Sequence, residues 1–215
     1  RYGEGVGWYD YFNTALKIDR NYKVGIYHKS KLVPGVEQMP YPQLFKWIEN
    51  FAIDLGGITG SLGKQEERTV FFNEKNVGVA PVVCYESVYG AFVAEYIKNG
   101  ANYIFIITND GWWGNTPGHK QHLAYAKLRA IETRRSIARA ANTGISGFIN
   151  QKGNIILQNN YWEQDALRAG LMANDKLTFY VKFGDYLGAF ALNGCYLLLF
   201  IAFIFLIFGK KQSQE

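Results

Sequence analysis

Two apolar runs joined by one helical segment constrain the fold of this chain more than any other feature. Residues 77–83 and 103–108 are rich in Val and Ile, and each run has the length of a buried strand. Between them, residues 88–98 have a helical pattern that Asn99 and Gly100 end. Strand, helix and strand at this spacing form a βαβ unit with a parallel pair of strands. The sequence therefore predicts an α/β domain.

Cys84 stands where the first of these strands meets the helical segment. The first N–H groups of a helix that starts there point towards the sulfur, and together with the helix dipole they favour a thiolate. They can also stabilise an oxyanion beside the sulfur. The other interpretation is a small buried apolar residue, which is the commoner role of a free cysteine. Glu86, two residues later, is placed to cap the start of the helix.

Other segments extend the α/β pattern. Five more strands, which include two hairpins, are predicted at residues 11–18, 22–27, 69–72, 145–150 and 154–158. Residues 119–141 predict one long helix, whose apolar face comprises Leu123, Ala126, Ala130, Ile137 and Ala141. A short amphipathic helix is expected after Pro42, and its apolar side comprises Leu44, Trp47, Ile48 and Phe51.

Residues 190–208 are almost wholly apolar, which distinguishes them from the rest of the chain. The run is close to the ~20 residues that an α-helix needs to cross a bilayer. A buried core helix is the alternative, but its neighbours would have to cover every face of it. The sequence therefore favours a membrane span. Lys210 and Lys211 follow it and indicate a cytoplasmic C-terminus, with the α/β domain on the other side of the membrane.

Charge and cysteine content exclude several classes of function. The net charge of +5 comes from scattered Lys and Arg, so the chain lacks the clustered basic footprint of a nucleic-acid-binding protein. A surface that meets anionic lipid is compatible with that charge. Cys84 and Cys195 imply no disulfide framework, and no Cys/His spacing typical of a metal site occurs. His28, His119 and His122 form no convincing ligand set, and surface or core roles are expected for them.

Four further residues are candidates for a site around Cys84. Lys29 follows a predicted strand; a lysine near a cysteine favours the thiolate and donates to an oxyanion, although lysine is usually a surface residue. Glu37 lies eight residues later and, taken alone, is a solvated loop carboxylate. Trp112 and Trp113 lie between glycines, which indicates an exposed loop that can contact lipid beside a membrane helix. No Ser/His/Asp arrangement, phosphate loop or metal motif stands out.

Six stretches of the sequence together resemble the carbon–nitrogen hydrolase (nitrilase) superfamily. They are YHKSKLVP at 27–34, VCYE at 83–86, TNDGWWG at 108–114, LRAIETRR at 128–135, ANTG at 141–144 and, more weakly, YFNTAL at 11–16. These stretches occur in the order that the family has, and they are spread over most of residues 11–158. With the apolar run at its end, the chain is similar to the membrane-bound N-acyltransferase branch of the superfamily and unlike its soluble amidases.

The resemblance implies a nitrilase-like α-β-β-α sandwich, of which this chain holds a part. Residues 1–172 are expected to form the nitrilase-like domain without its N-terminal part. A connector is expected at 173–189, a transmembrane helix at 190–208 and a cytoplasmic tail at 209–215. Since Arg1 is no initiator, we expect the chain to begin inside the domain, downstream of several membrane helices that the family has.

The resemblance also implies a Glu–Lys–Cys triad. Cys84 matches its nucleophile and Lys29 its lysine, whereas the triad glutamate is expected upstream of Arg1. Support of the site, rather than the role of general base, is expected from Glu37, Tyr85 and Glu86. Contact with substrate or lipid is expected from Asn109, Trp112 and Trp113.

The expected activity is N-acylation of bacterial lipoproteins without a cofactor or metal. An acyl chain of a phospholipid, with phosphatidylethanolamine as the expected donor, forms a thioester with Cys84. It then passes to the N-terminal amine of a diacylglyceryl-modified cysteine on an apolipoprotein. The resemblance implies a monomer in the bacterial inner (cytoplasmic) membrane, multi-pass in the full protein, with its catalytic domain on the periplasmic side. Two other functions stay open: a nitrilase-type amidase that hydrolyses a C–N bond, and a non-catalytic membrane-anchored binding domain.

Overall fold

A computed structural model of the protein describes residues 10–38 and 62–208. Its centre is a six-stranded mixed sheet with the strand order β3-β4-β5-β6-β7-β8. The strands are β3 (Phe71–Phe72), β4 (Gly78–Val83), β5 (Ala101–Asn109), β6 (Ser136–Asn142), β7 (Gly147–Ile149) and β8 (Ile155–Gln158). β4, β5 and β6 run parallel, and the other neighbours pair antiparallel. The predicted parallel pair and the second predicted hairpin, β7–β8, are confirmed.

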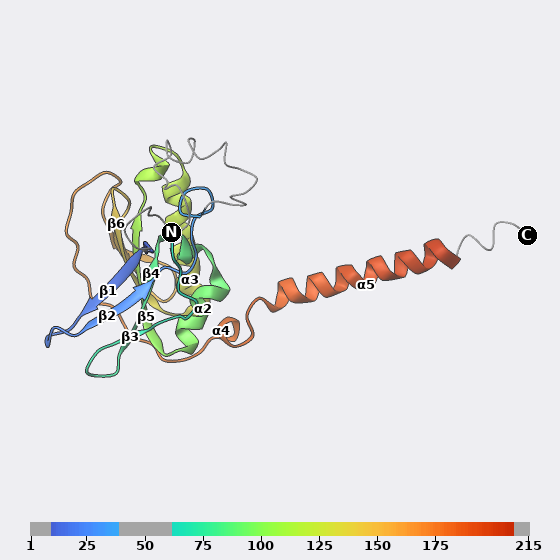
Figure 1. The fold of residues 1–215 in the computed structure, drawn as a ribbon, viewed down its shortest axis with the longest axis horizontal. Coiled ribbons are helices and arrows are strands. Elements are labelled where there is room, and N and C mark those ends of the chain that lie inside the picture. Colours follow the sequence, from blue (N-terminus) through green and yellow to red (C-terminus); the bar gives the residue numbers. More distant parts are fainter. Residues whose placement is uncertain (1–9, 39–61, 209–215) are drawn as a thin grey trace, which may run out of the picture.

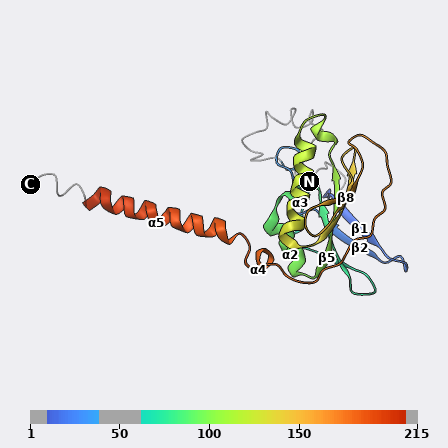
Figure 2. The ribbon, with the colours of Figure 1, turned by 180° about the vertical axis from the view of Figure 1, so that it is seen from behind.

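Two helices lie side by side on one face of this sheet (Figures 1 and 2). They are α2 (Gly90–Lys98) and α3 (Gly118–Thr133). The side chains of β5 explain which face they cover, because successive residues of a strand point to opposite faces of its sheet. Ile104 and Ile106 are buried in the core, whereas Phe105 and Ile107 are 42% and 49% exposed on the other face. The core of the domain therefore lies between the sheet and these two helices.

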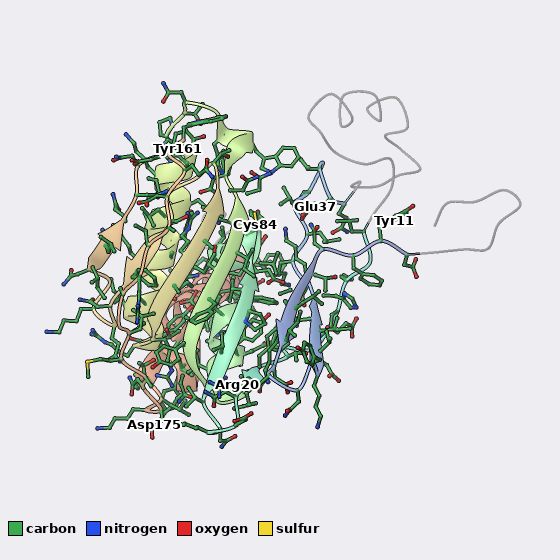
Figure 3. The ribbon with its side chains drawn as sticks, turned by 90° about the vertical axis from the view of Figure 1, so that its left-hand side faces the viewer. Tyr11, Arg20, Glu37, Cys84, Tyr161 and Asp175 are labelled. Carbon is green, nitrogen blue, oxygen red and sulfur yellow. The ribbon has the colours of Figure 1, made fainter. Side chains whose placement is uncertain are left out.

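A separate two-stranded sheet forms the first predicted hairpin, with strands shorter than expected. Its strands are β1 (Thr14–Ile18) and β2 (Val24–His28), and it lies beside the β4 side of the large sheet (Figure 3). Tyr27 of β2 is fully buried, and its ring meets the ring of Tyr96 in α2 edge-on at 5.8 Å. The described residues thus form an α/β fold with one helical layer, and they contain the expected four-layer sandwich only in part. The short helix expected after Pro42 lies outside the described residues.

The long helix expected over residues 119–141 is wrong in its second half. α3 ends at Thr133, Arg134 takes a left-handed conformation (φ 52°), and the chain then continues as β6. Alanine and arginine favour a helix locally, but β6 pairs in parallel with β5 along its whole length, and this pairing overrides the local preference. Three of the expected face residues are buried on α3, namely Leu123, Ala126 and Ala130. The other two lie on β6, namely Ile137 and Ala141.

Two helices follow the sheet domain, α4 (Phe179–Phe183) and α5 (Tyr186–Phe208). Thr178 fastens the start of α4, because its Oγ1 accepts from the N–H of Val181 at 3.1 Å and donates to the carbonyl of Glu132 at 2.6 Å. Val181 itself is fully buried in the core. The connector expected at 173–189 therefore contains a short docked helix and the first residues of α5.

α5 extends away from the domain as a single rod (Figure 1). Among the described residues it is the one helix long and apolar enough to cross a membrane, over Tyr186–Ile207. No part of that window is buried, in contrast to the core helix of a soluble protein. The helix predicted at 190–208 is thus confirmed as a helix and begins four residues earlier.

Candidate active site

Cys84 lies at the carboxyl end of β4 and begins a five-residue 3₁₀ helix, η2 (Cys84–Val88). Its φ of 52° is in the left-handed region, which costs a residue with a Cβ roughly 1–2 kcal/mol. Such a conformation persists only where the surroundings hold it, and it is typical of functional sites. The helix predicted at residues 88–98 is confirmed as α2, which begins at Gly90, six residues after the cysteine. The N–H groups next to the sulfur therefore belong to a short turn, which sums few peptide dipoles.

Glu86 joins the strand that carries the cysteine to the loop that carries the lysine. Its fully buried carboxylate accepts from Val83 N at 2.7 Å, Ser30 N at 2.6 Å and the Tyr27 hydroxyl at 2.6 Å. Val83 directly precedes the cysteine and Ser30 directly follows the lysine, so one side chain fixes both backbones. The predicted cap is confirmed on η2. Burial raises the pKa of Glu86, and the donated hydrogen bonds act against that rise.

Lys29 and Glu37 form an ion pair inside the loop that follows β2. Lys29 is 1% exposed, and its Nζ lies 2.8 Å from Oε1 and 2.7 Å from Oε2 of Glu37. The N–H of Val33 donates to Oε2 at 2.8 Å, and the Asn13 side-chain amide donates to Oε1. A surface lysine and a solvated loop carboxylate, the ordinary expectations for these residue types, are therefore wrong. Figure 3 shows Glu37 near the end of the large sheet at which Cys84 lies.

A pocket of about 470 Å³ opens at Cys84, with largely apolar and aromatic walls. Its lining comprises Val33, Val36, Glu37, Cys84, Tyr85, Val88, Asn109, Trp112, Trp113, Gly118, Gln121, His122 and Tyr125. The two tryptophans belong to a 3₁₀ helix, η3 (Gly111–Trp113), and are 54% and 45% exposed, which confirms the predicted exposed loop. Asn109 ends β5, and its Oδ1 accepts from the N–H of Gly111 at 3.0 Å.

Most of the predicted site residues meet at this pocket. Glu37, Tyr85, Asn109, Trp112 and Trp113 line it together with the cysteine. The lysine is joined to the pocket wall through its ion pair, and the buried glutamate of η2 lies outside the lining. In the part of the chain that the structure describes, no three His, Cys, Asp or Glu side chains gather into a group that could hold a metal ion.

The structure also assembles a Ser–His–Asp chain, whereas the sequence indicates none. His122 on α3 has Nδ1 2.9 Å from Asp110 Oδ1 and Nε2 3.0 Å from Ser87 Oγ. Asp110 is fully buried, and its Oδ2 accepts from Arg139 Nη2 at 2.6 Å. The wrongly extended helix hides this cluster, because it places Arg139 on the helix of His122 instead of on β6. The position of Asp110 after a predicted strand was the one signal that could have indicated it.

The pKa of Asp110 predicts how stability depends on pH. Burial acts to raise this pKa, but the hydrogen bond from His122 and the charge of Arg139 outweigh it and lower the pKa to about 2. Because the unfolded value is roughly 3.9, the ionised carboxylate stabilises the fold above about pH 4. We expect this contribution, about 2 kcal/mol, to be lost as the pH falls from about 4 to about 2.

Acid unfolding followed by circular dichroism checks this expectation. Asp110→Asn cannot ionise, so the variant should be less stable than the wild type at pH 7 and should lose less stability between pH 4 and pH 2. Equal slopes for the two proteins across that range would contradict the assignment.

The chain is similar in sequence to a known family and to curated proteins. The family model named carbon-nitrogen hydrolase matches residues 6–175 of the chain. An apolipoprotein N-acyltransferase of Chlorobaculum tepidum is 35% identical over 165 residues, which cover 75% of this chain and 31% of the relative. One of Haemophilus ducreyi is 29% identical over 211 residues, which cover 95% of this chain and 40% of the relative. The chain thus spans about a third of the length of these curated relatives.

The fold has a counterpart among solved structures. Nit3 of Saccharomyces cerevisiae, a member of branch 10 of the nitrilase superfamily, superimposes with a TM-score of 0.52 and 14% sequence identity. The match covers 71% of this chain and 51% of Nit3, and it shows a nitrilase-type α/β fold. The family model spans well over half of the chain and includes every site residue described above. The resemblance found in the sequence is confirmed, and the chain belongs to the carbon-nitrogen hydrolase family.

Proposed function

We propose that this chain is part of an apolipoprotein N-acyltransferase in which Cys84 carries the acyl group. One observation carries the proposal: a thiol lies on the wall of a largely apolar pocket, in a chain whose α5 is apolar and exposed on every side. An enzyme whose two substrates are both anchored in a bilayer needs this combination, whereas a soluble amidase has no use for α5. The names of the relatives support the proposal. The match to the Haemophilus ducreyi relative covers 95% of this chain, so it includes at least most of α5.

In the proposed first half-reaction, the Cys84 thiolate attacks the carbonyl carbon of the sn-1 ester of a phospholipid, with phosphatidylethanolamine as the donor. A glutamate upstream of Arg1 is the proposed general base that takes the thiol proton. Lys29 and the N–H of Tyr85 donate to the tetrahedral oxyanion. The ester C–O bond then breaks, the lysophospholipid leaves as an alcohol with the proton that the glutamate held, and the acyl chain stays on sulfur.

In the second half-reaction, the α-amine of a diacylglyceryl-modified cysteine on an apolipoprotein attacks the thioester. A thioester suits this step because amines attack it more readily than they attack an oxygen ester. The C–N bond forms and the C–S bond breaks, and the amine proton passes through the same glutamate to the sulfur. These two steps balance without a cofactor, and they return Cys84 as a free thiol.

The ion pair between Lys29 and Glu37 has a defined part in this mechanism. Two hydrogen bonds from Nζ to the two carboxylate oxygens leave the ammonium little freedom. A donor that is already oriented stabilises a developing oxyanion without reorganisation during the reaction. We therefore assign Glu37 the role of positioning Lys29, not of accepting the thiol proton.

We place the protein in the bacterial inner membrane as a monomer. α5 is proposed to cross the bilayer, with the tail at 209–215 in the cytoplasm and the domain at 1–172 on the periplasmic side. Lys210 and Lys211 after the helix support this orientation. The site would then lie on the side of the membrane where exported lipoproteins are processed.

Trp112 and Trp113 are proposed to contact the acyl chain or the lipid surface at the pocket. Replacing both with alanine is expected to raise the KM for phospholipid ~10-fold and to leave kcat within ~2-fold, because the lost contact weakens binding rather than chemistry. Steady-state rates in mixed micelles measure both constants. Trp162→Ala is the matched control, since this tryptophan is 63% exposed and lies outside the pocket. The same KM increase in the control would contradict the assignment.

One experiment separates the candidate functions. The intact membrane protein, including any sequence that precedes Arg1, is given phosphatidylethanolamine labelled in its sn-1 chain, a diacylglyceryl lipopeptide and, in a parallel reaction, a set of small amides. An N-acyltransferase produces labelled amide and lysophospholipid in equal amounts. An amidase instead releases ammonia from small amides and leaves the lipopeptide unchanged, and a binding domain does neither. Either of the last two results would overturn the proposal.

A further inference from the structure

We propose that Ser87 and His122 are positioning residues for Cys84. Their side chains bind its backbone carbonyl oxygen and thereby fix the direction in which its thiol points. The inference rests on the proposed role of Cys84 as the acyl carrier. Ser87 Oγ donates to the Cys84 carbonyl at 2.8 Å, and His122 Nε2 lies 3.2 Å from the same oxygen. Two side chains, from η2 and from α3, thus converge on one backbone atom of the nucleophile.

The conformation of Cys84 explains why its carbonyl needs support. A φ of 52° is unfavourable for a residue with a Cβ, so an unsupported turn would relax towards negative φ. Rotation about the N–Cα bond of Cys84 redirects its Cβ–Sγ bond. The direction from which sulfur approaches the ester carbonyl carbon changes with it. A misplacement of about 1 Å at a reacting atom can cost ~100-fold in rate. Contacts that hold the carbonyl therefore act on the chemical step.

The donors and acceptors of Ser87 and His122 explain how these two side chains connect Asp110 to Cys84. The Ser87 hydroxyl has one proton, and donation to Cys84 leaves its oxygen free to accept from His122 Nε2. On the other side of the ring, Nδ1 faces the carboxylate of Asp110 at 2.9 Å. The imidazole thus bridges the carboxylate of Asp110 to the backbone of the nucleophile.

The cluster is anchored at its far end. Asp110 is itself held by Arg139 at 2.6 Å and by the Thr108 hydroxyl at 3.1 Å. Arg139 also lies 3.3 Å from His122 Nδ1, and it donates to the carbonyl of Ile145. Thr108 lies on β5 and Arg139 on β6, so the orientation of the imidazole is fixed by the sheet and not by α3 alone.

The cluster resembles the triad of a serine hydrolase in composition but not in exposure. Ser87 is 1% exposed, and its hydroxyl is directed at the Cys84 carbonyl. It does not line the pocket, whereas His122 does. A serine that no substrate reaches cannot act as a nucleophile, which leaves support of the neighbouring cysteine as the role of this cluster.

Two measurements on the intact membrane protein test the proposal, both in a Cys195→Ala background so that Cys84 is the one thiol of this segment. The first is the single-turnover rate constant for acylation of Cys84 by phosphatidylethanolamine at several concentrations. The second is the rate constant for alkylation of Cys84 by iodoacetamide, which needs no lipid. Ser87→Ala and His122→Ala are expected to lower the acylation rate constant ~10- to 100-fold and to leave the half-saturating lipid concentration within ~2-fold.

Matched variants distinguish positioning from general damage. His119 is also buried on α3, but it stacks on Tyr161 at 3.8 Å, so His119→Ala is expected to acylate at the wild-type rate. Imidazole added to His122→Ala should restore part of the lost rate, because the vacated volume borders the pocket. It should not restore Ser87→Ala. The double variant should lose little more than either single one, since both act through one carbonyl.

Three results would overturn the proposal. The first is wild-type acylation and alkylation rates in folded Ser87→Ala and His122→Ala, with folding checked by thermal melting. The second is an equal loss in His119→Ala. The third is a loss expressed only in the half-saturating lipid concentration. If the proposed function fails instead, iodoacetamide would alkylate Cys84 of the wild type, but phospholipid would not acylate it. In that case, slower alkylation of Ser87→Ala and His122→Ala than of the wild type would still support positioning.

Discussion

Replacing Cys84 with alanine in the intact membrane protein is expected to lower the rate of lipoprotein N-acylation by at least ~10³-fold. Sulfur is the atom to which the acyl chain is attached in the proposed mechanism, and alanine offers no nucleophile there. Cys84→Ser should also be nearly inactive, because an alcohol is a poorer nucleophile and its ester is attacked slowly by amines. Mass spectrometry of lipoprotein N-termini from cells that depend on the variant measures the loss.

The second cysteine provides the control for this result. Cys195 is exposed on α5 and does not line the pocket. Cys195→Ala is expected to acylate at the wild-type rate, and thermal melting should show that both alanine variants are folded. Normal triacylation of lipoproteins by Cys84→Ala would contradict the proposed role of the thiol.

Replacing Glu86 with alanine is expected to lower the free energy of unfolding by about 3–5 kcal/mol. The carboxylate satisfies the Val83 and Ser30 N–H groups and the Tyr27 hydroxyl, and all three would lose their acceptor in a site that water does not reach. Glu86→Gln is the sharper variant because it keeps the shape. Its amide nitrogen must face at least one of these donors, so a loss of roughly 1–3 kcal/mol is still expected. Chemical denaturation in detergent measures both values.

Glu95 is the matched control for the stability measurement. It lies on α2, is 52% exposed on its side chain and pairs with Arg68 at 3.1 Å. Glu95→Gln is expected to change the free energy of unfolding by less than about 1 kcal/mol, as exposed ion pairs usually do. If Glu86→Gln proved as stable as the wild type, the link between the cysteine strand and the lysine loop would not depend on this carboxylate.

The fold was predictable where the residues of consecutive strands themselves show a strand pattern. The β4–β5 pair and both hairpins have this property, and the alternation along β5 is plain in its sequence. β6 was not predictable by the same means. Its residues, SIARAAN, contain one β-branched side chain and three alanines, and a buried arginine occupies an inward position. Its pairing with β5 and with β7, together with the ion pair to Asp110, makes a strand of it.

The candidate site could be inferred from the sequence only in part. Cys84 and Lys29 follow from a strand end and from motifs, and Trp112 and Trp113 from their flanking glycines. The pairing of Lys29 with Glu37 depends on a loop whose path no periodicity describes. The link between Cys84 and His122 joins residues 38 positions apart through a backbone carbonyl, which leaves no pattern in the sequence.

The central claim, that Cys84 holds the acyl chain, is tested most directly by trapping the intermediate. The intact membrane protein is incubated with phosphatidylethanolamine and without acceptor, then digested, and the peptide that contains Cys84 is weighed by mass spectrometry. The proposed mechanism predicts that this peptide gains the mass of one acyl chain, that hydroxylamine at neutral pH removes it, and that about one lysophospholipid is released per protein. An unmodified Cys84 in a preparation that transfers acyl chains once acceptor is added would contradict it.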